Sequence, residues 1–454
     1  MMEYLSRKLR TEFFAVALLC FLVVSLVGAT PTGFHATDPG VQEGLPNAGS
    51  PFSTLTGSEL DLFKAGKDAF QEAEGVGDGL GPRFNLDGCA ACHAAPDVGG
   101  TSPAVNPQVA VATAFGADNS VPFFVTRDGP VREARFKYNY NNRTKTRDGG
   151  VHALFVISHR VDTTGDASGC NIQQEDYQAQ AKRRNLIFRI PTPVFGAGLI
   201  EQIPDDAITG NYAVDRLRKA MLGIFGHPNF NGNDGTIARF GWKAQNKSLL
   251  LFSGEAYNVE MGISNELFQQ ERDETLNCQF ASTPNDITNT DGGTGDNTLS
   301  DVEKFSAFMR FLAPPAPSLT TPGGAPSIAN GRALFTSVGC AYCHTPTFTT
   351  GKSNIAALSN QQVNLYSDLL LHRMGSTLAD DILQGQAGPD EFRTAPLWGL
   401  GQRIFFLHDG RTSDLLEAIG MHSSSSSEAN GVIRNFSRLS EAQKQDLLNF
   451  LRSL

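Results

Sequence analysis

Two copies of one five-residue motif constrain this chain more than any other feature. Residues 89–93 read Cys-Ala-Ala-Cys-His, and residues 340–344 read Cys-Ala-Tyr-Cys-His. Two intervening residues place both thiols on one helical turn and the histidine follows directly, so each copy gathers two sulfurs and one imidazole. Three kinds of site use such a set: covalently attached haem, zinc, or a redox-active dithiol.

The start of the chain has the features of a secretory signal. Basic side chains within residues 7–10 precede an apolar run over 13–28, and small side chains lead up to Ala29. This order predicts a signal peptide over residues 1–29, cleaved after Ala29, and export to the periplasm. An uncleaved anchor is the alternative, although the run is shorter than the roughly 20 apolar residues that span a bilayer.

Export helps to decide between the three kinds of site. A zinc site would need a second Cys/His pair close to each motif, and neither motif has one. A dithiol motif does not need the histidine. We therefore predict two covalently bound c-type haems, with the thiols joined to the haem vinyl groups and the histidines ligating iron. The predicted attachment residues are Cys89, Cys92, Cys340 and Cys343, and the predicted iron ligands are His93 and His344.

Two further cysteines, Cys170 and Cys278, lie in polar, loop-like sequence. A disulfide between them would suit an oxidising compartment and would close a long loop. Two free thiols are the alternative, and the spacing alone does not decide between them.

The two motifs belong to a repeated unit. A short predicted helix precedes each motif, and Gly66 and Phe70 in the first align with Gly331 and Phe335 in the second. Downstream, Pro-x-Phe/Trp-Gly-x-Gly occurs at residues 193–198 and again at 396–401. Two degenerate copies of one domain explain both similarities.

The expected fold is mainly α, with two cytochrome c-like haem domains. The N-terminal domain covers residues 55–312, and we expect loop-rich insertions and a few short strands in it, for example at 109–114 and 121–126. A Pro/Gly-rich linker follows at 313–327. The C-terminal domain covers 328–454 and ends in a capped helix with leucines on one face.

The charge balance narrows the class of partner. Lys plus Arg number 37 against 47 for Asp plus Glu, giving a formal net charge of −10. A nucleic-acid partner is therefore not expected, because binding phosphates needs basic surface. A basic redox partner, or simple solubility, fits better. Asp291 and Asp296 could hold calcium, but their spacing matches no known loop, which favours a solvated surface loop.

Several longer segments carry a resemblance to a known family. They are residues 79–85, 240–244, 366–380, 392–401, 407–411 and 416–419. Together with the two motifs they resemble the di-haem oxidoreductase family. That family is a branch of the superfamily of bacterial di-haem cytochrome c peroxidases, which also contains the di-haem enzyme that matures methylamine dehydrogenase. The resemblance covers residues 55–454.

The resemblance implies a role for each haem. The N-terminal haem would react with peroxide and have His93 as its proximal ligand. Glu260, in Asn-Val-Glu-Met-Gly, would be the acid–base group, because peroxide must lose a proton and then have its distal oxygen protonated. A surface glutamate is the alternative. Relatives often have a glutamine a few residues earlier, where this chain has Phe252, so the pocket is expected to be less polar.

The resemblance also marks residues between and beyond the haems. Trp242 would relay electrons between them, with core packing as the alternative, and Trp398 would pack in the second haem pocket. The second haem would take His344 and a sixth ligand, His422, with Met421 as its rival; the family's His-Gly-Gly-Glu-Ala is here interrupted by five serines.

The other histidines carry weaker expectations. His152 or His159 could cap the first haem in a resting state, although a structural role is favoured for both. His372 and His408 would support haem edges or propionates, and Arg189 and Arg393 would do likewise.

Three functions compete on this basis. The first is a periplasmic peroxidase that reduces hydrogen peroxide with electrons from a small cytochrome c or cupredoxin. The second is a di-haem enzyme that oxidises or oxygenates another substrate. The third is a non-catalytic electron carrier with both irons six-coordinate. Relatives also suggest a homodimer.

Overall fold

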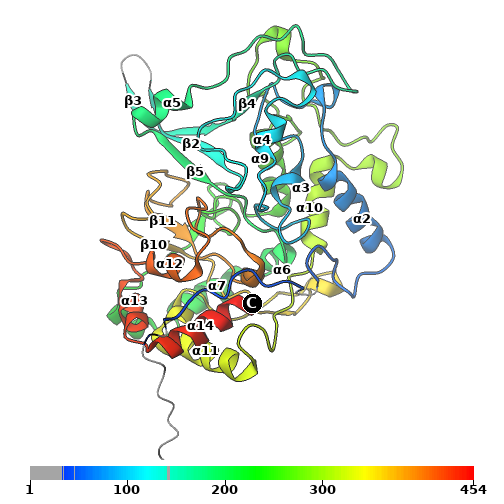
Figure 1. Cartoon of the computed structure of the whole chain (residues 1–454). Helices are drawn as coiled ribbons and strands as arrows, with labels where there is room; N and C mark the ends of the chain where they lie inside the picture. The colour runs from blue at the N-terminus through cyan, green and yellow to red at the C-terminus, as the bar shows by residue number, and fades with distance from the viewer. Residues whose placement is uncertain (1–32, 34, 45–46, 141–143) are drawn as a thin grey trace, which may run out of the picture.

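A computed structural model describes residues 33, 35–44, 47–140 and 144–454, and the predicted signal peptide lies outside these residues. The fold is rich in helices with short strands between them, as expected for a mainly α protein (Figure 1). The helices are α2 Ser58–Gln71, α3 Cys89–Cys92, α4 Gln108–Val111, α5 Tyr177–Lys182, α6 Ala197–Glu201, α7 Asp205–Ala213, α8 Arg216–Leu222, α9 Leu249–Met261, α10 Asp301–Phe311, α11 Ala325–Val338, α12 Leu415–Gly420, α13 Asn430–Ser437 and α14 Glu441–Arg452.

The first motif lies beside a pair of helices, α2 and α10, which pack against each other in Figure 1. They approach closely because Gly66 has no side chain: a Cβ there would lie 2.4 Å from the Lys304 carbonyl oxygen and 3.0 Å from the Phe308 Cβ. The Phe70 ring packs 4.8 Å from Phe308 and 5.9 Å from His93. The α2–α10 helix pair therefore packs against the motif histidine through Phe70.

The second motif lies beside an equivalent pair, α11 and α14. A Cβ on Gly331 would lie 2.0 Å from the Asp446 carbonyl oxygen and 2.6 Å from the Phe450 Cβ. The Phe335 ring packs 5.5 Å from Phe450 and 6.3 Å from His344. Each residue of the predicted alignment thus makes the same kind of contact in both halves.

The downstream similarity is also structural. Gly198 in the first copy would place a Cβ 2.0 Å from the carbonyl oxygen of Arg310, at the end of α10. Gly401 in the second copy would place one 2.2 Å from the carbonyl oxygen of Arg452, at the end of α14. The repeat predicted from sequence is therefore visible in both parts of the chain. That each unit is a cytochrome c fold stays a prediction.

The apolar interior does not divide as simply as the predicted domains. One core combines the first helix pair with buried side chains between residues 348 and 370 and with Trp398. The other contains the second helix pair together with Ile224 and Ala36. The two halves therefore contribute side chains to each other's apolar core.

The strands lie mostly elsewhere than expected. A three-stranded antiparallel sheet has the order β3-β2-β5. The strands are β1 Arg83–Phe84, β2 Glu133–Tyr140, β3 Lys145–His152, β4 Phe155–Val156, β5 Leu186–Arg189, β6 Asn229–Phe230, β7 Ile237–Ala238, β8 Phe348–Thr349, β9 Gln362–Val363, β10 Leu371–Arg373 and β11 Glu391–Arg393.

The two short strands that we predicted at 109–114 and 121–126 are wrong. Half of the first segment lies in α4, and the Asn106 Oδ1 accepts the Gln108 amide at 2.9 Å in the turn that leads into this helix. In the second, the Val125 amide donates to the Pro122 carbonyl oxygen at 2.9 Å, which closes a turn.

Two tethers fix remote parts of the chain. Cys170 and Cys278 form a buried disulfide, the pairing that the sequence left open. Near the N-terminus, Asp38 forms an ion pair with Arg452 of α14. Among the described residues, no helix is both long and apolar enough to cross a bilayer.

Candidate functional site

The first motif opens onto a cavity of about 360 Å³. α3 supplies Cys89 and Cys92, and His93 caps that helix by donating its backbone amide to the Cys89 carbonyl oxygen. The His93 Nδ1 lies 2.9 Å from the Gly100 carbonyl oxygen and donates to it, which leaves Nε2 as the free ligand atom. Burial lowers the pKa of His93, so the ring is neutral, as a metal ligand must be.

The far wall of this cavity is the helix α9. Phe252, Ala256 and Glu260 recur at a spacing of four residues and all line the cavity. The Glu260 Oε2 accepts a hydrogen bond from the Asn85 Nδ2 at 2.7 Å. The Asn85 Oδ1 in turn accepts the Leu154 amide at 2.9 Å, which fixes the orientation of the side-chain amide. Phe252 stacks on Phe240, with ring centres 6.2 Å apart.

Glu260 has a second carboxyl as its neighbour. Burial and the adjacent Glu133 carboxyl, to which it is hydrogen-bonded, raise the pKa of Glu260 well above its usual value. Glu133 begins strand β2 and accepts a hydrogen bond from the Arg135 guanidinium at 3.3 Å. Two carboxyls and an arginine therefore lie together at the cavity wall.

The second motif opens onto another cavity, of about 220 Å³. The His344 Nδ1 donates to the Tyr366 carbonyl oxygen at 3.0 Å, so its Nε2 is the free ligand atom. Burial, together with the nearby His422, lowers the pKa of His344 to about 4. His422 also lines this cavity, and its Nδ1 donates to the Ala418 carbonyl oxygen at 2.8 Å. Met421 is not one of the lining residues.

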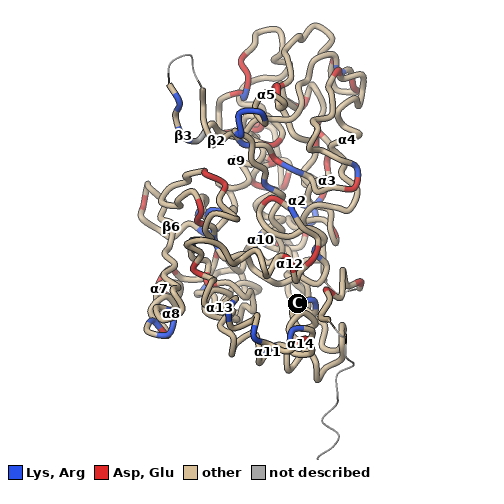
Figure 2. The backbone as a smooth tube through the Cα atoms, turned by 60° about the vertical axis from the view of Figure 1, so that its left-hand side comes forward, with Lys and Arg blue, Asp and Glu red and all other residues tan. Residues whose placement is uncertain are grey.

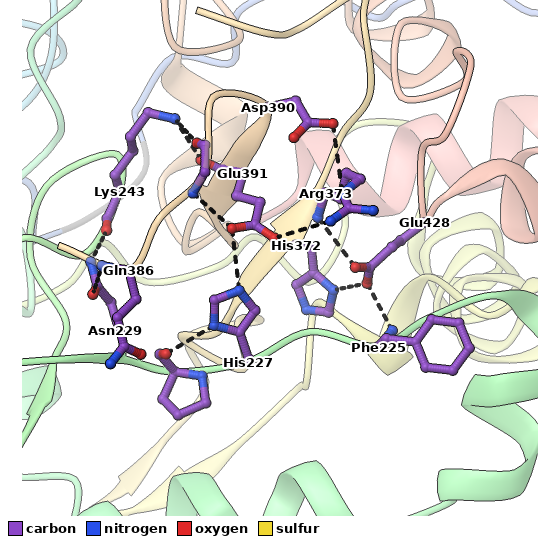
Figure 3. Close-up of polar contacts among 12 residues, drawn as sticks. Phe225, His227, Asn229, Lys243, His372, Arg373, Gln386, Asp390, Glu391 and Glu428 are labelled. Carbon is purple, nitrogen blue, oxygen red and sulfur yellow. Dashed lines mark hydrogen bonds and ion pairs between the residues drawn. The ribbon is translucent and has the colours of Figure 1, made fainter. Parts of the chain in front are cut away.

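The five-serine run holds the residues on either side of it. The Ser427 hydroxyl donates to the His422 carbonyl oxygen at 2.6 Å, and the Ser424 hydroxyl donates to the Met374 carbonyl oxygen at 3.0 Å. At the end of the run, Glu428 reaches His372, whose Nδ1 lies 2.8 Å from the carboxylate (Figure 3). The insertion therefore leaves His422 and Glu428 both at the second cavity.

His372 lies at the edge of this cavity between two acids. Its Nε2 lies 2.9 Å from the Asp368 Oδ2 and its Nδ1 faces both Glu428 and the Cys343 sulfur, at 3.7 Å. Burial lowers the pKa of His372, but the Cys343 sulfur and the Asp368 carboxylate outweigh it and raise that pKa well above its usual value. Each ring nitrogen faces a carboxylate oxygen, and the ring also contacts an attachment cysteine.

Trp242 lies between the two cavities and lines both of them. Its Nε1 donates to the Ile190 carbonyl oxygen at 2.9 Å, which fixes the indole. Its ring meets His408 edge-on at 6.4 Å, and His408 stacks on Phe392 at 4.5 Å. We expected Trp398 to pack in the second haem pocket, but it does not line the second cavity. It packs against Gly196 beside a smaller space of about 30 Å³.

Three comparisons with known proteins bear on this geometry. Residues 133–454 match the family described as "Di-haem oxidoreductase, putative peroxidase". The chain belongs to this family. A solved structure of hydrazine synthase from Kuenenia stuttgartiensis is similar over 94% of this chain and 99% of that chain, with 14% identity and a TM-score of 0.36. At that score the likeness carries no information on activity. No curated protein matches the chain significantly.

Membership of the di-haem oxidoreductase family implies haem cofactors, and both cavities fit them. Each combines two thiols and an imidazole with apolar walls. In the first cavity, three buried polar atoms have no hydrogen-bond partner among the described residues. These are the Arg189 Nε, the Gln245 Oε1 and the Ser253 Oγ. A bound group with polar substituents would satisfy such atoms.

The second cavity also contains buried polar groups that a haem could satisfy, the guanidinium groups of Arg393 and Arg403. Both are buried there, and in the described parts of the chain neither forms an ion pair with a carboxylate. Burial lowers the pKa of each to about 10, helped for Arg393 by its neighbour Arg403. Buried guanidinium groups fit the carboxylates of a haem.

The structure does not support His152 or His159 as a cap of the first haem, and its described residues show no calcium site. His152 stacks on Phe136 at 3.6 Å and pairs with Glu175, and His159 is about half exposed; neither lines the first cavity. Over the described ranges, no cluster of three or more His, Cys, Asp or Glu side chains is placed to hold a metal ion, so calcium stays an untested prediction.

Sequence reasoning missed a buried ion network beside Trp242. The Asp380 carboxylate bonds the Arg189 guanidinium at 2.8 Å and the Lys243 ammonium at 3.0 Å. Lys243 also donates to the carbonyl oxygens of Gly388 and Glu391, the latter shown in Figure 3, and burial lowers its pKa to about 8. This network ties β5 to the C-terminal half. It also engages Arg189, which was expected to serve a propionate.

Proposed function

We propose that this family member reduces hydrogen peroxide at the first cavity, with electrons that arrive through the second. The single observation that carries the proposal is the Glu260–Glu133 pair, which lies in the same cavity as the free Nε2 of His93. Reducing one peroxide to two waters consumes two electrons and two protons. A donor protein supplies the electrons, and the carboxyl pair supplies protons at the reacting oxygen.

Haem bound through Cys89 and Cys92, with His93 as its ligand, would supply the redox centre that accepts the peroxide oxygen. The Glu260–Glu133 pair takes a proton from the incoming peroxide, and Glu260 returns one to the distal oxygen, which leaves as water. Because that proton is returned, the two protons consumed with the two electrons come from solvent and pass through the same pair. Asn85 holds the Glu260 carboxyl in place through the 2.7 Å hydrogen bond.

At the second cavity, His344 and His422 offer two neutral imidazoles to one iron. Haem bound there would be held by both histidines, so this site would store and transfer electrons and would not bind peroxide. Trp242 lies between the sites and is the proposed electron relay. The second site therefore serves the first.

The test is peroxide turnover by half-reduced holoprotein, measured as oxidation of a reduced small cytochrome c. Glu260→Gln keeps the size and the hydrogen bond but cannot transfer a proton, and should reduce turnover by about 10²- to 10⁴-fold. Glu74→Gln is the matched control, because Glu74 is a buried carboxyl with a pKa raised by burial to about 7 that does not line the cavity. Equal losses in both variants would contradict the assignment.

One observation favours a second candidate, oxidation of an organic substrate at the same cavity. The stacked rings of Phe252 and Phe240 give α9 an aromatic side next to Glu260. An aromatic wall suits an apolar molecule better than peroxide alone requires. Peroxide consumption that requires an added phenol, which is oxidised in its place, and that is not supported by the donor protein would favour this candidate.

A further inference from the structure

The helix α8 exposes large apolar side chains, where a soluble protein usually presents polar ones. Leu217 is 83% exposed, Met221 79%, Phe225 61% and Val214 57%. We call these four residues, on α8 and at its two ends, the α8 patch. Apolar side chains gathered on one short element mark a surface that another molecule covers.

The α8 patch lies over the second motif. On the inner side of α8, the Leu222 side chain packs in the same core as Cys340 and Cys343. A Cβ on Gly339, the residue before Cys340, would lie 3.4 Å from the Leu222 Cδ1. The outer face of the helix is therefore separated from the attachment segment by one layer of side chains.

A chain of contacts also joins Phe225 to the second motif. The Phe225 amide donates to the Glu428 Oε2 at 2.8 Å, and the same oxygen lies 2.8 Å from the His372 Nδ1 (Figure 3). His372 contacts the Cys343 sulfur at 3.7 Å. Gly226 lies so close to the His372 ring that a Cβ there would come within 2.2 Å of it. The loop after α8 thus contacts His372, the side chain that contacts the motif.

The charge around the α8 patch is opposite to that of the chain. The chain carries a formal net charge of −10. Arg216 and Arg218 are exposed on α8, and Arg434 and Arg438 are exposed on and just after α13, the helix that packs against it. Asp215 is the only acidic residue in residues 214–225. Figure 2 shows α8 as one of the blue segments of the backbone.

We propose that the α8 patch is the docking surface for a small electron-donor protein whose own exit face is apolar and ringed by carboxylates. This inference rests on the proposed function, in which the second site receives electrons. The donor loses one electron in each encounter and the oxidised second site gains it, so two encounters supply one peroxide. The apolar centre gives contact and the arginine rim gives steering. The local charge favours an acidic partner face, whereas net charge alone favoured a basic partner.

The experiment measures electron transfer without peroxide. Oxidised holoprotein is mixed in a stopped-flow instrument with two reduced probes, a small acidic cupredoxin and a lysine-rich mitochondrial cytochrome c. Binding of the oxidised probes is measured separately by chemical-shift titration. The variants are Leu217→Asp with Met221→Asp, and Arg216→Glu with Arg218→Glu. The control is Leu276→Asp, because Leu276 is 85% exposed and lies outside the α8 patch.

The variant with Leu217→Asp and Met221→Asp should slow transfer from the acidic probe by about ten-fold or more and weaken its binding. The variant with Arg216→Glu and Arg218→Glu should slow transfer from the acidic probe and speed transfer from the basic one, and both effects should fade as salt rises. Rates unchanged in both variants, or changed as much by Leu276→Asp, would overturn the inference. Self-association of the protein in sedimentation, if Leu217→Asp with Met221→Asp abolishes it, would also overturn the inference, because a second copy would then occupy the patch. Loss of peroxide turnover alone would affect only the proposed function.

Discussion

The two cavities are built on the same scaffold and differ in what faces the motif histidine. In each, a helix pair meets at a glycine, Gly66 or Gly331, and a phenylalanine packs toward the histidine. The first cavity is lined by the carboxyl of Glu260, whereas the second is lined by the imidazole of His422. A carboxyl can donate a proton and would leave a haem iron open, whereas an imidazole would ligate it. The proposed function rests on this difference, with chemistry at the first cavity and electron storage at the second.

The scaffold that the copies share should fail first under substitution. Valine at Gly331 would meet the Asp446 carbonyl oxygen, and at Gly66 the Lys304 carbonyl oxygen, and neither backbone atom can yield. Overpacking of this kind costs about 3 kcal/mol of unfolding free energy. Chemical denaturation of each variant measures it. Gly210→Ala, on α7 with open space around it, should change stability by less than about 1 kcal/mol; a valine variant no less stable than this control would contradict the shared packing.

The cavities should respond to pH with opposite signs. Burial lowers the pKa of His408 to about 4 from 6.5, so the unfolded chain binds a proton first and stability falls as pH drops from 6.5 to 4. This contribution is about 3 kcal/mol. His408→Gln should remove it from the denaturation midpoints measured across that window.

For Glu260 the sign reverses. Burial and Glu133 raise its pKa, so the folded protein keeps a proton that the unfolded chain releases, and stability falls as pH rises above 4.5. Glu260→Gln should flatten that decline, and a decline of the same slope in the variant would show that another group causes it.

The relay between the cavities should be sensitive to the indole. Trp242→Phe should slow electron transfer between the haems by about ten-fold, equivalent to about 1.4 kcal/mol of activation free energy. Flash photolysis of the half-reduced protein measures this rate directly. Trp398→Phe is the control, since Trp398 lines neither large cavity. An equal effect in that variant would mean that Trp242 has a packing role and is not a relay.

The smallest expected effect is at Glu133. Glu133→Gln removes the like charge that helps to raise the pKa of Glu260, so the loss of activity at high pH should begin at lower pH. The pH profile of peroxide turnover measures this shift. A profile that keeps its midpoint and loses only height would mean that Glu133 positions Arg135 and does not share a proton.

Features encoded over short distances could be predicted from sequence. The motifs and the Gly66–Gly331 equivalence follow from local spacing, and the two glycines make the same kind of contact in both halves. His422, which the family resemblance marked, lines the second cavity, and its role as a ligand stays a prediction. The strands predicted at 109–114 and 121–126 failed because a short apolar run suits a helix or a turn equally well, and Asn106 and Pro122 decided the outcome.

Pairings across the chain could not be predicted. Glu133 lies far in sequence from Glu260, and Asp380 far from Arg189, so only the folded topology shows that they meet. One signal was present: Glu133 and Arg135 alternate along the strand, so they share one face at its buried beginning. Charged residues on such a face point to an interior polar site.

The most direct test of this account is the spin state of the two irons in the oxidised holoprotein, read by electron paramagnetic resonance. The difference between Glu260 and His422 predicts one high-spin iron with an open position and one low-spin iron between two histidines. His422→Ala should convert the second signal to high spin, and Met421→Ala should leave it unchanged. Two low-spin irons in the unmodified protein, or a second signal that follows Met421, would contradict the account.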